Sequence, residues 1–373
     1  MEPTAAHWLI LGIALGALAL AIRLAIRLQR RRVEARAYLK GVRYVISDDP
    51  DAAIEALSDA ARLGSPEAVE TYLALGALFR RTGDLARAVR LHRNMLLRAG
   101  LEPARRTEIE RELAEDYRRG GMVGEAEAAY RALWERGDRA AGAGLRDVLV
   151  DAGRLAEAAE LQRALGGPGE DPVRAHLLAG LARSGLPDDP GAAREAAQAA
   201  VAACPGSADA LLALAEAEGA RGARDEAAAA ISGAVAADPG CALLAWPALD
   251  RLGDPARALA LVEGWRVAAP GDAALLYLRG RALHRAGRNA EALEALRAAM
   301  DADATGEVTL VMRELLRDAG DPRPEELAAR HDLMVKALQR RARPLRCARC
   351  GAESPRRAWR CLRCGAFESL RPV

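Results

Sequence analysis

The chain has 373 residues, of which 51% are hydrophobic but only 3% are aromatic. A single globular core of that size would normally use more Phe, Tyr and Trp, so Ala and Leu must provide the packing, which suits closely packed helices. The formal net charge of +2 gives no bulk attraction for nucleic acid. We therefore expect an all-α fold and no nucleic-acid partner.

An apolar segment without formal charge lies near the N-terminus, where residues 5–22 read AAHWLILGIALGALALAI. A helix continued to residue 28 would be long enough for the ~30 Å hydrocarbon layer of a membrane. No Lys or Arg precedes the segment, and six arginines follow it, at 23, 27, 30, 31, 32 and 36. This asymmetry predicts a single-pass anchor at 1–30 with the remaining chain on the cytoplasmic side. A buried core helix and a helix lying in the membrane interface are the alternatives.

A short motif recurs along the middle of the chain, consisting of Leu-Gly, an aromatic residue, a turn Gly and then Ala. Its clearest copy occupies residues 69–96, where Gly76, Phe79, Gly83 and Ala88 stand at the small, aromatic, turn and small positions of the tetratricopeptide pattern. A second clear copy occupies residues 274–300. Each copy predicts an antiparallel helix pair.

The turn glycines set the repeat length, because they fall at 83, 121, 153, 222, 253 and 287, with gaps of 38, 32, 69, 31 and 34 residues. The longest gap corresponds to about two units of ~34 residues. One pair cannot cover its own apolar face, so successive pairs stack into a superhelix with a concave groove. We predict a tetratricopeptide solenoid of about eight to nine helix pairs at 31–342.

Grooves of this kind usually bind an extended peptide or a helix from a partner. The repeat register places several arginines toward the groove, which suggests a preference for an acidic partner segment. The alternative is that these side chains are ordinary solvated helix surface. The predicted groove residues are Arg80, Arg81, Arg111, Arg118, Arg119, Arg281 and Arg285.

Four of the six cysteines form two C-x-x-C pairs in the segment CARCGAESPRRAWRCLRCG at 347–365. Two residues between thiolates let a tight turn present both sulfurs to one tetrahedral ion, and Gly351 and Gly365 suit the positive φ of such a turn. We therefore predict a small rubredoxin-like zinc ribbon with four cysteine ligands at 343–373. The predicted metal ligands are Cys347, Cys350, Cys361 and Cys364.

The four-thiolate set is compatible with zinc or with a mononuclear iron, and a structural zinc ion is favoured because a closed site needs no redox role. A pair of disulfides is the remaining alternative, which the cytoplasmic assignment disfavours. We expect the ribbon to pack on the solenoid and fix its shape. Its arginines could dock it onto an acidic patch or bind nucleic acid; they are Arg346, Arg349, Arg356, Arg357, Arg360 and Arg363.

Catalytic motifs of hydrolases, zinc proteases and P-loop enzymes do not occur, and the histidines are scattered at 7, 92, 176, 284 and 331. His92 stands at a packing position of a predicted helix and is interpreted as a core residue. The sequence thus favours a non-enzymatic protein. A generic scaffold for envelope or secretion complexes and a rubredoxin-type electron carrier are the competing functional classes.

Three stretches carry a resemblance to a known family: YLKGVRYVISDDPDAAIEAL at 38–57, LALGALFRRTGDLARAVRLHRNML at 73–96, and the cysteine tail with Trp359 two residues before Cys361. Together they resemble the lipopolysaccharide assembly protein B (LapB) family of Gram-negative bacteria. In this chain the middle repeats are richer in Ala, and the interval around Arg356 is basic where the family is more aromatic.

The resemblance implies an inner-membrane protein whose cytoplasmic repeats and rubredoxin-like domain restrain lipopolysaccharide synthesis. Family members act as adaptors for the membrane protease FtsH and promote degradation of the deacetylase LpxC. The resemblance also implies that the four cysteines are the metal ligands. Lipopolysaccharide or its assembly proteins are further partners that it suggests.

Overall fold

The computed structural model describes residues 69–97, 101–167, 169, 171–302, 345–354 and 358–372, with scattered positions between 16 and 56. The predicted anchor lies largely outside these residues, as do the predicted domain boundaries at 30/31 and 342/343. Within the described part of the chain, no helix combines the length and apolar character needed to cross a membrane.

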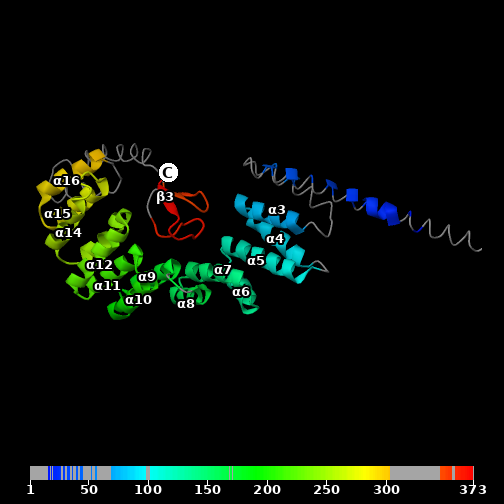
Figure 1. Cartoon of the computed structure of the whole chain (residues 1–373), viewed down its shortest axis with the longest axis horizontal. Coiled ribbons are helices and arrows are strands. Elements are labelled where there is room, and N and C mark those ends of the chain that lie inside the picture. The colour runs from blue at the N-terminus through cyan, green and yellow to red at the C-terminus, as the bar shows by residue number, and fades with distance from the viewer. Residues whose placement is uncertain are drawn as a thin grey trace, which may run out of the picture. The chain divides into compact units, whose positions relative to one another are not determined.

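The described chain is almost entirely helical until its last residues, where three short strands follow (Figure 1). The helices are α3 (Val69–Thr82), α4 (Leu85–Leu96), α5 (Pro103–Arg119), α6 (Val123–Glu135), α7 (Arg139–Asp151), α8 (Leu155–Leu165), α9 (Pro172–Gly185), α10 (Pro190–Ala203), α11 (Ala208–Ala220), α12 (Arg224–Ala237), η1 (Pro239–Ala245), α13 (Trp246–Arg251), α14 (Pro255–Arg266), α15 (Ala273–Arg285) and α16 (Asn289–Ala302). The strands are β1 (Leu345–Cys347), β2 (Glu353–Ser354) and β3 (Leu370–Pro372).

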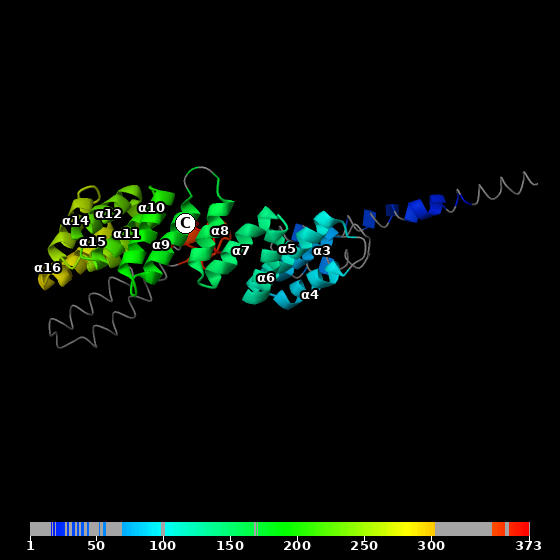
Figure 2. The same cartoon turned by 90° about the horizontal axis from the view of Figure 1, so that it is seen from below.

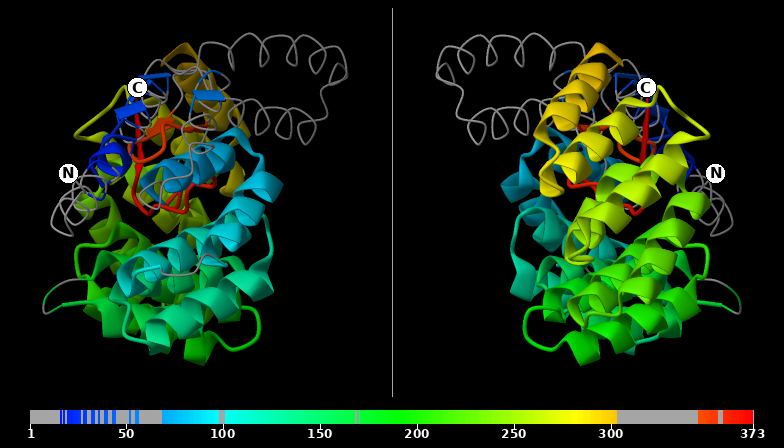
Figure 3. Two further views of the ribbon diagram at one scale, coloured as in Figure 1. Left: turned by 90° about the vertical axis from the view of Figure 1, so that its right-hand side faces the viewer. Right: turned by 90° about the vertical axis from the view of Figure 1, so that its left-hand side faces the viewer.

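The chain forms two compact units, 1–152 and 153–373. In the first, α3 packs on α4, α4 on α5, α5 on α6 and α6 on α7, and Figure 2 shows α3 to α6 side by side. In the second, α8 to α12 pack in the same sequential manner, as do α14, α15 and α16 (Figure 3). Within each unit this arrangement is the predicted tetratricopeptide stacking of helix pairs. The predicted count of eight to nine pairs includes residues outside the described ones and stays a prediction.

Glycine turns join the helices of most pairs, as the repeat spacing predicted, and residues 186–189, without a glycine, join α9 to α10. The six predicted turn glycines, at 83, 121, 153, 222, 253 and 287, have φ between 61° and 85°. Residues with a Cβ adopt this left-handed region only at a steric cost, so glycine is favoured at such turns. The spacing of these glycines along the sequence therefore indicates the spacing of the turns. Gly137, with φ 89°, makes a similar turn between α6 and α7 that the motif did not reveal.

Small residues occupy the helix crossings. The alanines that lie five positions after the six turn glycines are all buried; they are Ala88, Ala126, Ala158, Ala227, Ala258 and Ala292. Gly280 of α15 faces Leu296 of α16 so closely that a Cβ at Gly280 would lie 2.6 Å from Leu296 Cγ. Leu296 is itself fully buried and cannot move into solvent.

Gly280→Ala is therefore expected to destabilise the second unit by about 1–2 kcal/mol. Overpacking a core costs about 1–3 kcal/mol, and the better helix propensity of Ala returns roughly 1 kcal/mol. Urea unfolding of the purified chain measures the change. Gly264→Ala in α14 is the matched control, because no atom lies within 4 Å of its added Cβ. This control is expected to be neutral or stabilising, and an equal loss in both variants would contradict the packing argument.

One repeat departs from the regular pair. The segment before α14 is split into the 3-10 helix η1 and the six-residue α13. Pro239 stands at the start of η1 and Pro247 at the start of α13. Each proline lacks a backbone N–H and favours a helix start, so one continuous helix cannot form there.

The C-terminal strands form a small antiparallel sheet with the order β2-β1-β3. β1 lies in the centre, and Cys347 at its end is opposite Leu370 of β3. This sheet belongs to the second unit and places the first cysteine pair next to the chain's final strand. The ribbon predicted at the end of an otherwise helical chain is thus present.

Candidate metal centre and its docking on the repeats

Two tight turns of the same design hold the cysteines. In the first, Gly351 N donates to Cys347 O at 2.9 Å, and Cys347 N donates to Ala352 O at 2.9 Å. The same two bonds recur around Cys361, where Gly365 N donates to Cys361 O at 2.8 Å. Both glycines have positive φ, 70° and 73°, as the sequence predicted. Each turn therefore directs both of its sulfurs to one side.

The four sulfurs converge on one point. All four Sγ atoms lie within 4.8 Å of one another. Cys347 Sγ is 3.6 Å from Cys364 Sγ, and Cys350 Sγ is 3.8 Å from Cys361 Sγ. Sulfurs bound at about 2.3 Å around a tetrahedral ion would be about 3.8 Å apart, so the donor set fits such an ion. The four cysteines form a rubredoxin-like metal-binding site, in which no disulfide joins them.

The site's own hydrogen bonds prepare one thiol to ionise. Burial opposes ionisation of Cys347, but Ser369 Oγ at 3.1 Å and the backbone N–H groups of Arg349 and Cys350 outweigh it and lower its pKa to about 6. Burial raises the pKa of Cys364 to about 12. A bound cation would supply the charge that stabilises the remaining thiolates.

The ribbon packs on the repeats through one histidine of α9, which confirms the predicted packing. Glu368 Oε1 lies 2.9 Å from His176 Nε2. The ring of Phe367 stacks on His176 at 5.3 Å and 9°, and that of Trp359 lies 5.6 Å away at 37°. Glu368 has φ 46°, the one positive φ among the non-glycine residues that the structure describes. Backbone strain of this kind persists where surrounding contacts fix a functional geometry.

On the side of the ring away from Glu368, His176 is part of a buried network of charged residues. Its Nδ1 lies 2.6 Å from Asp209 Oδ2 of α11, and Arg183 of α9 donates to Asp209 Oδ1 at 2.6 Å. Arg183 also pairs with Glu216 at 2.8 Å. Both His176 and Asp209 are buried. The sequence pattern does not predict this site, because the spacing of His176 and Arg183 along one helix carries no information about their distant partners.

The sequence suggested that arginines of the ribbon dock it onto an acidic patch of the repeats, and the observed contact between ribbon and repeats is different. In the contacts described, the ribbon contributes the acid, Glu368, and the repeats contribute the base, His176. Ribbon arginines have other partners: Arg346 pairs with Glu353 at 3.0 Å, and Arg360 Nε donates to Gly365 O at 3.2 Å.

The network makes the stability of the second unit depend on pH. Burial disfavours the protonated form of His176, but the hydrogen bonds and charges of Asp209 and Glu368 outweigh burial and raise its pKa above 6.5. Arg183 faces the group from beyond Asp209. Because the folded pKa is the higher one, this stabilisation is complete below pH 6.5 and is lost as pH rises through the folded value.

We expect the melting temperature of the second unit to fall as pH rises above 6.5, and to fall less steeply in Glu368→Gln, which lacks one of the two charges. Calorimetry at several pH values between 6 and 9 compares the two slopes. Identical slopes in both proteins would show that the Glu368–His176 pair does not carry the effect.

Most of the seven predicted groove arginines form ion pairs with acidic residues of the chain itself. Arg281 lies over Trp246, 4.1 Å from the ring centroid, and Arg81 is exposed. The other five form ion pairs: Arg80 with Glu112 and Asp116, Arg111 with Asp138, Arg118 with Glu115 and Asp151, Arg119 with Glu115, and Arg285 with Asp250. An acidic partner segment would therefore compete with these carboxylates, and its capture stays a prediction.

Asp116 centres the strongest of these clusters. It is fully buried, accepts from Arg80 at 2.7 Å, and lies 2.5 Å from His92 Nδ1. His92 is also fully buried, and its Nε2 has no hydrogen-bond partner within the described ranges. The sequence interpretation of His92 as a core residue is confirmed, and Arg80 is occupied mainly in linking neighbouring helices.

Comparisons with known proteins match both parts of the chain. A family model described as a rubredoxin metal binding domain of the LapB zinc-ribbon type matches residues 346–372. A tetratricopeptide repeat model matches residues 38–100 and 245–307. Lipopolysaccharide assembly protein B of Escherichia coli, in strain K12 and in O157:H7, is 31% identical over 109 residues. That match covers 29% of this chain and 28% of the length of those relatives.

Solved structures with similar repeats have lower identity. A tetratricopeptide repeat protein from Parabacteroides merdae is 21% identical, with 77% of this chain and 98% of that chain covered and a TM-score of 0.34. The C-terminal part of a repeat protein from Cytophaga hutchinsonii is 12% identical, with 63% and 96% covered and a TM-score of 0.46.

Proposed function

We propose that this tetratricopeptide protein is a non-enzymatic adaptor that restrains lipopolysaccharide synthesis. The match to the LapB-type ribbon model and the similarity to the Escherichia coli relative support this proposal. The adaptor holds the membrane protease FtsH and the deacetylase LpxC together, so that LpxC is degraded. One observation carries the proposal: a LapB-type ribbon is docked on tetratricopeptide repeats in one compact unit.

The ion of the ribbon has a structural role in this proposal. Cys347, Cys350, Cys361 and Cys364 would hold zinc in a closed set of four ligands, and zinc supplies cross-linking of the two turns. The chain's own residues then position the ribbon, because Glu368 follows the fourth cysteine by four residues and reaches His176. Metal analysis of the purified chain separates zinc from iron, and a reversible one-electron couple would instead favour an electron carrier.

The membrane anchor raises the local concentration of the adaptor. Residues 1–30 would hold the repeats (31–342) and the ribbon (343–373) on the cytoplasmic face of the bacterial inner membrane. Tethering converts weak contacts with another membrane protein into effectively intramolecular ones without any new interface. An adaptor of this kind needs no catalytic group of its own.

Co-purification from detergent-solubilised membranes tests the proposal. The tagged chain is expected to bring down both FtsH and LpxC, and a chain without residues 1–30 is expected to bring down less FtsH. Recovery of other envelope proteins with neither FtsH nor LpxC would contradict the proposal and support a generic scaffold. Lipopolysaccharide in the same eluate would identify it as a further partner.

The arginine hypothesis is tested on the same material. Arg118→Glu with Arg119→Glu is expected to reduce recovery of LpxC, because two positive charges of the proposed groove become negative and repel an acidic partner segment. Both substitutions also remove the pairing with Glu115, so thermal melting of the purified chain accompanies the assay. Arg163→Glu is the control, because Arg163 is exposed and its ion pair, with Glu160, lies within the same helix. Unchanged recovery in the double variant would remove these arginines from the partner surface.

A further inference from the structure

Two aromatic side chains fix the position of one arginine on the repeats of the second unit. The guanidinium of Arg281 in α15 lies over the indole ring of Trp246, with its Cζ 4.1 Å from the ring centroid. Its Nη1 donates to Tyr277 Oη, one helical turn earlier, at 3.4 Å. Both rings are more than nine-tenths buried, so close packing keeps them in place. Arg281 itself is half-buried, and part of it therefore remains accessible to solvent.

The irregular repeat before α14 supplies the indole. A small residue stands seven positions before most of the turn glycines, at 76, 114, 215 and 280. Gly253 instead has Trp246 at that position. Pro247 breaks the helix there, so Trp246 is the first residue of α13, and the neighbouring η1 segment packs against α15. A large aromatic ring therefore replaces a small residue and meets Arg281 of the next repeat.

Arg281 has no acidic partner in the described part of the chain. Of the seven predicted groove arginines, it is the one that is half-buried and yet forms no ion pair with a described carboxylate. A guanidinium has five N–H donors in one plane, and stacking on an aromatic ring leaves those donors free to bind at its edge. The bond to Tyr277 uses one of them. Arg281 is thus a pre-positioned cation with unused donors.

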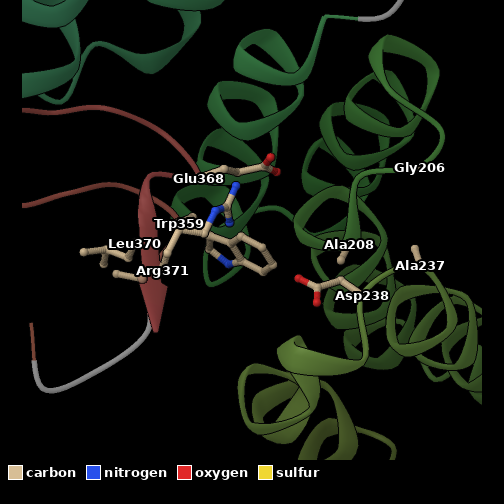
Figure 4. Close-up of a pocket in the computed structure, with 9 residues that line it drawn as sticks. Gly206, Ala208, Ala237, Asp238, Trp359, Glu368, Leu370 and Arg371 are labelled. Atoms are coloured by element: carbon tan, nitrogen blue, oxygen red, sulfur yellow. The ribbon is translucent and has the colours of Figure 1, made fainter. Parts of the chain in front are cut away.

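The ribbon contains a complete arrangement of the same kind. In the pocket where the ribbon meets the repeats, Figure 4 shows the side chain of Arg371 beside the indole of Trp359 and beside Glu368. There the indole, the guanidinium and the carboxylate all belong to this chain, so the charge of Arg371 is balanced internally. At α15 the described residues supply the indole and the guanidinium, and the carboxylate is the missing member.

The charges next to Arg281 also favour an acidic occupant. Arg285, one turn further along α15, is 57% exposed and adds a second positive charge. Asp250 of α13, 39% exposed, pairs with Arg285 at 2.9 Å and compensates that charge. Of these three charged groups, Arg281 is therefore the one left uncompensated. Exposed ion pairs are worth only about 0–1 kcal/mol, so the pairing of Asp250 with Arg285 adds little barrier to an incoming acid.

We propose that Arg281, stacked on Trp246, binds the side-chain carboxylate of an aspartate or glutamate in an acidic segment of a partner protein. The planar fork of N–H donors matches the two oxygens of a carboxylate, and stacking reduces the freedom that the arginine loses on binding. A carboxylate on a flexible side chain reaches a half-buried cation more readily than a backbone terminus does. The inference rests on the proposed adaptor role and narrows the predicted groove to one anchoring position.

The test uses the full-length chain in detergent, labelled with 5-fluorotryptophan, because the indole of Trp246 reports on the guanidinium above it. The Trp246→Phe variant assigns the fluorine resonance of Trp246 among those of the five tryptophans. The probes are acetyl-Ala-Glu-Ala amide, its neutral counterpart acetyl-Ala-Gln-Ala amide, and acetyl-Ala-Gln-Ala with a free C-terminal carboxylate. A saturable shift of the Trp246 resonance is expected with the glutamate peptide, at an affinity roughly threefold or more above that of either glutamine peptide.

Two substitutions at the same position separate the fork from the charge. Arg281→Gln is expected to abolish the shift, and Arg281→Lys, which keeps the charge without the planar fork, is expected to weaken binding roughly threefold or more. Arg257→Gln is the matched control, because Arg257 is also half-buried but already pairs with Asp225 at 2.6 Å, and it should leave the affinity unchanged. The resonances of the other tryptophans show whether each variant is folded.

Several results would overturn the proposal: an unmoved Trp246 resonance, equal affinities for the glutamate peptide and its neutral counterpart, tightest binding of the free C-terminal carboxylate, or wild-type affinity in either Arg281 variant. The peptides contain no FtsH or LpxC sequence, and recovery of those two proteins is measured separately. Failure of the binding test would therefore remove the Arg281 site and leave the adaptor proposal to its own experiment.

Discussion

Cys361→Ser, or removal of the ion by a chelator, is expected to unfold the ribbon and release it from α9. Binding of structural zinc to zinc-finger peptides is worth about 10–16 kcal/mol at neutral pH, which exceeds what a sheet with strands of two or three residues can replace. Loss of the ribbon removes Phe367 and Trp359 from His176 and exposes the repeat core beneath them. Metal content, limited proteolysis and thermal melting of the purified chain measure these changes.

Cys204→Ser is the matched control for this prediction, because it makes the same chemical change at a buried cysteine outside the site. This variant is expected to keep one ion per chain and a protected ribbon. If Cys361→Ser retained both the metal and the protease resistance of the wild type, the four sulfurs would not be the ligands. If it lost the metal and melted unchanged, the ribbon would not stabilise the repeats.

Asp209→Ala is expected to lower the free energy of unfolding of the second unit by about 3–5 kcal/mol. The substitution removes the buried carboxylate that binds both His176 and Arg183. Glu368 and Glu216 remain as their partners, but taking one acid out of a buried charge network is costly. In a unit of this size the loss corresponds to a fall of roughly 10 °C in melting temperature. Differential scanning calorimetry measures it, and proteolysis reports whether the ribbon is released at the same time.

Asp225→Ala provides the comparison for an exposed ion pair. Asp225 pairs with Arg257 at 2.6 Å, but its side chain is 85% exposed, so the change is expected to be within about 0.5 kcal/mol. Equal losses of free energy of unfolding in the two variants would mean that the buried Asp209 network stabilises the fold no more than an exposed ion pair does.

The turns and the cysteine site were predictable because each depends on a few neighbouring residues. A turn needs a residue that tolerates positive φ, so the spacing of Gly83, Gly121 and the later turn glycines revealed the helix pairs. The two C-x-x-C turns carry their own hydrogen bonds, so Cys347 and Cys361 could be assigned to one site from spacing alone.

Packing of the ribbon on the repeats was expected, but the residues that form the contact could not be predicted, because they are distant in sequence. His176 and Glu368 are 192 positions apart, and neither has a local motif. The same limit applies to the groove arginines: the register placed Arg80 on its helix, but only the packed structure brings Asp116 against it. Pairing between helices depends on how successive pairs stack, which a repeat pattern does not specify.

The most direct test of the adaptor proposal is the lifetime of LpxC after protein synthesis is stopped, in cells that contain or lack this chain. The proposal predicts that LpxC persists several-fold longer without the chain, that the wild-type chain restores rapid FtsH-dependent loss, and that Cys361→Ser does not. An LpxC lifetime that is the same in all of these cells would contradict it.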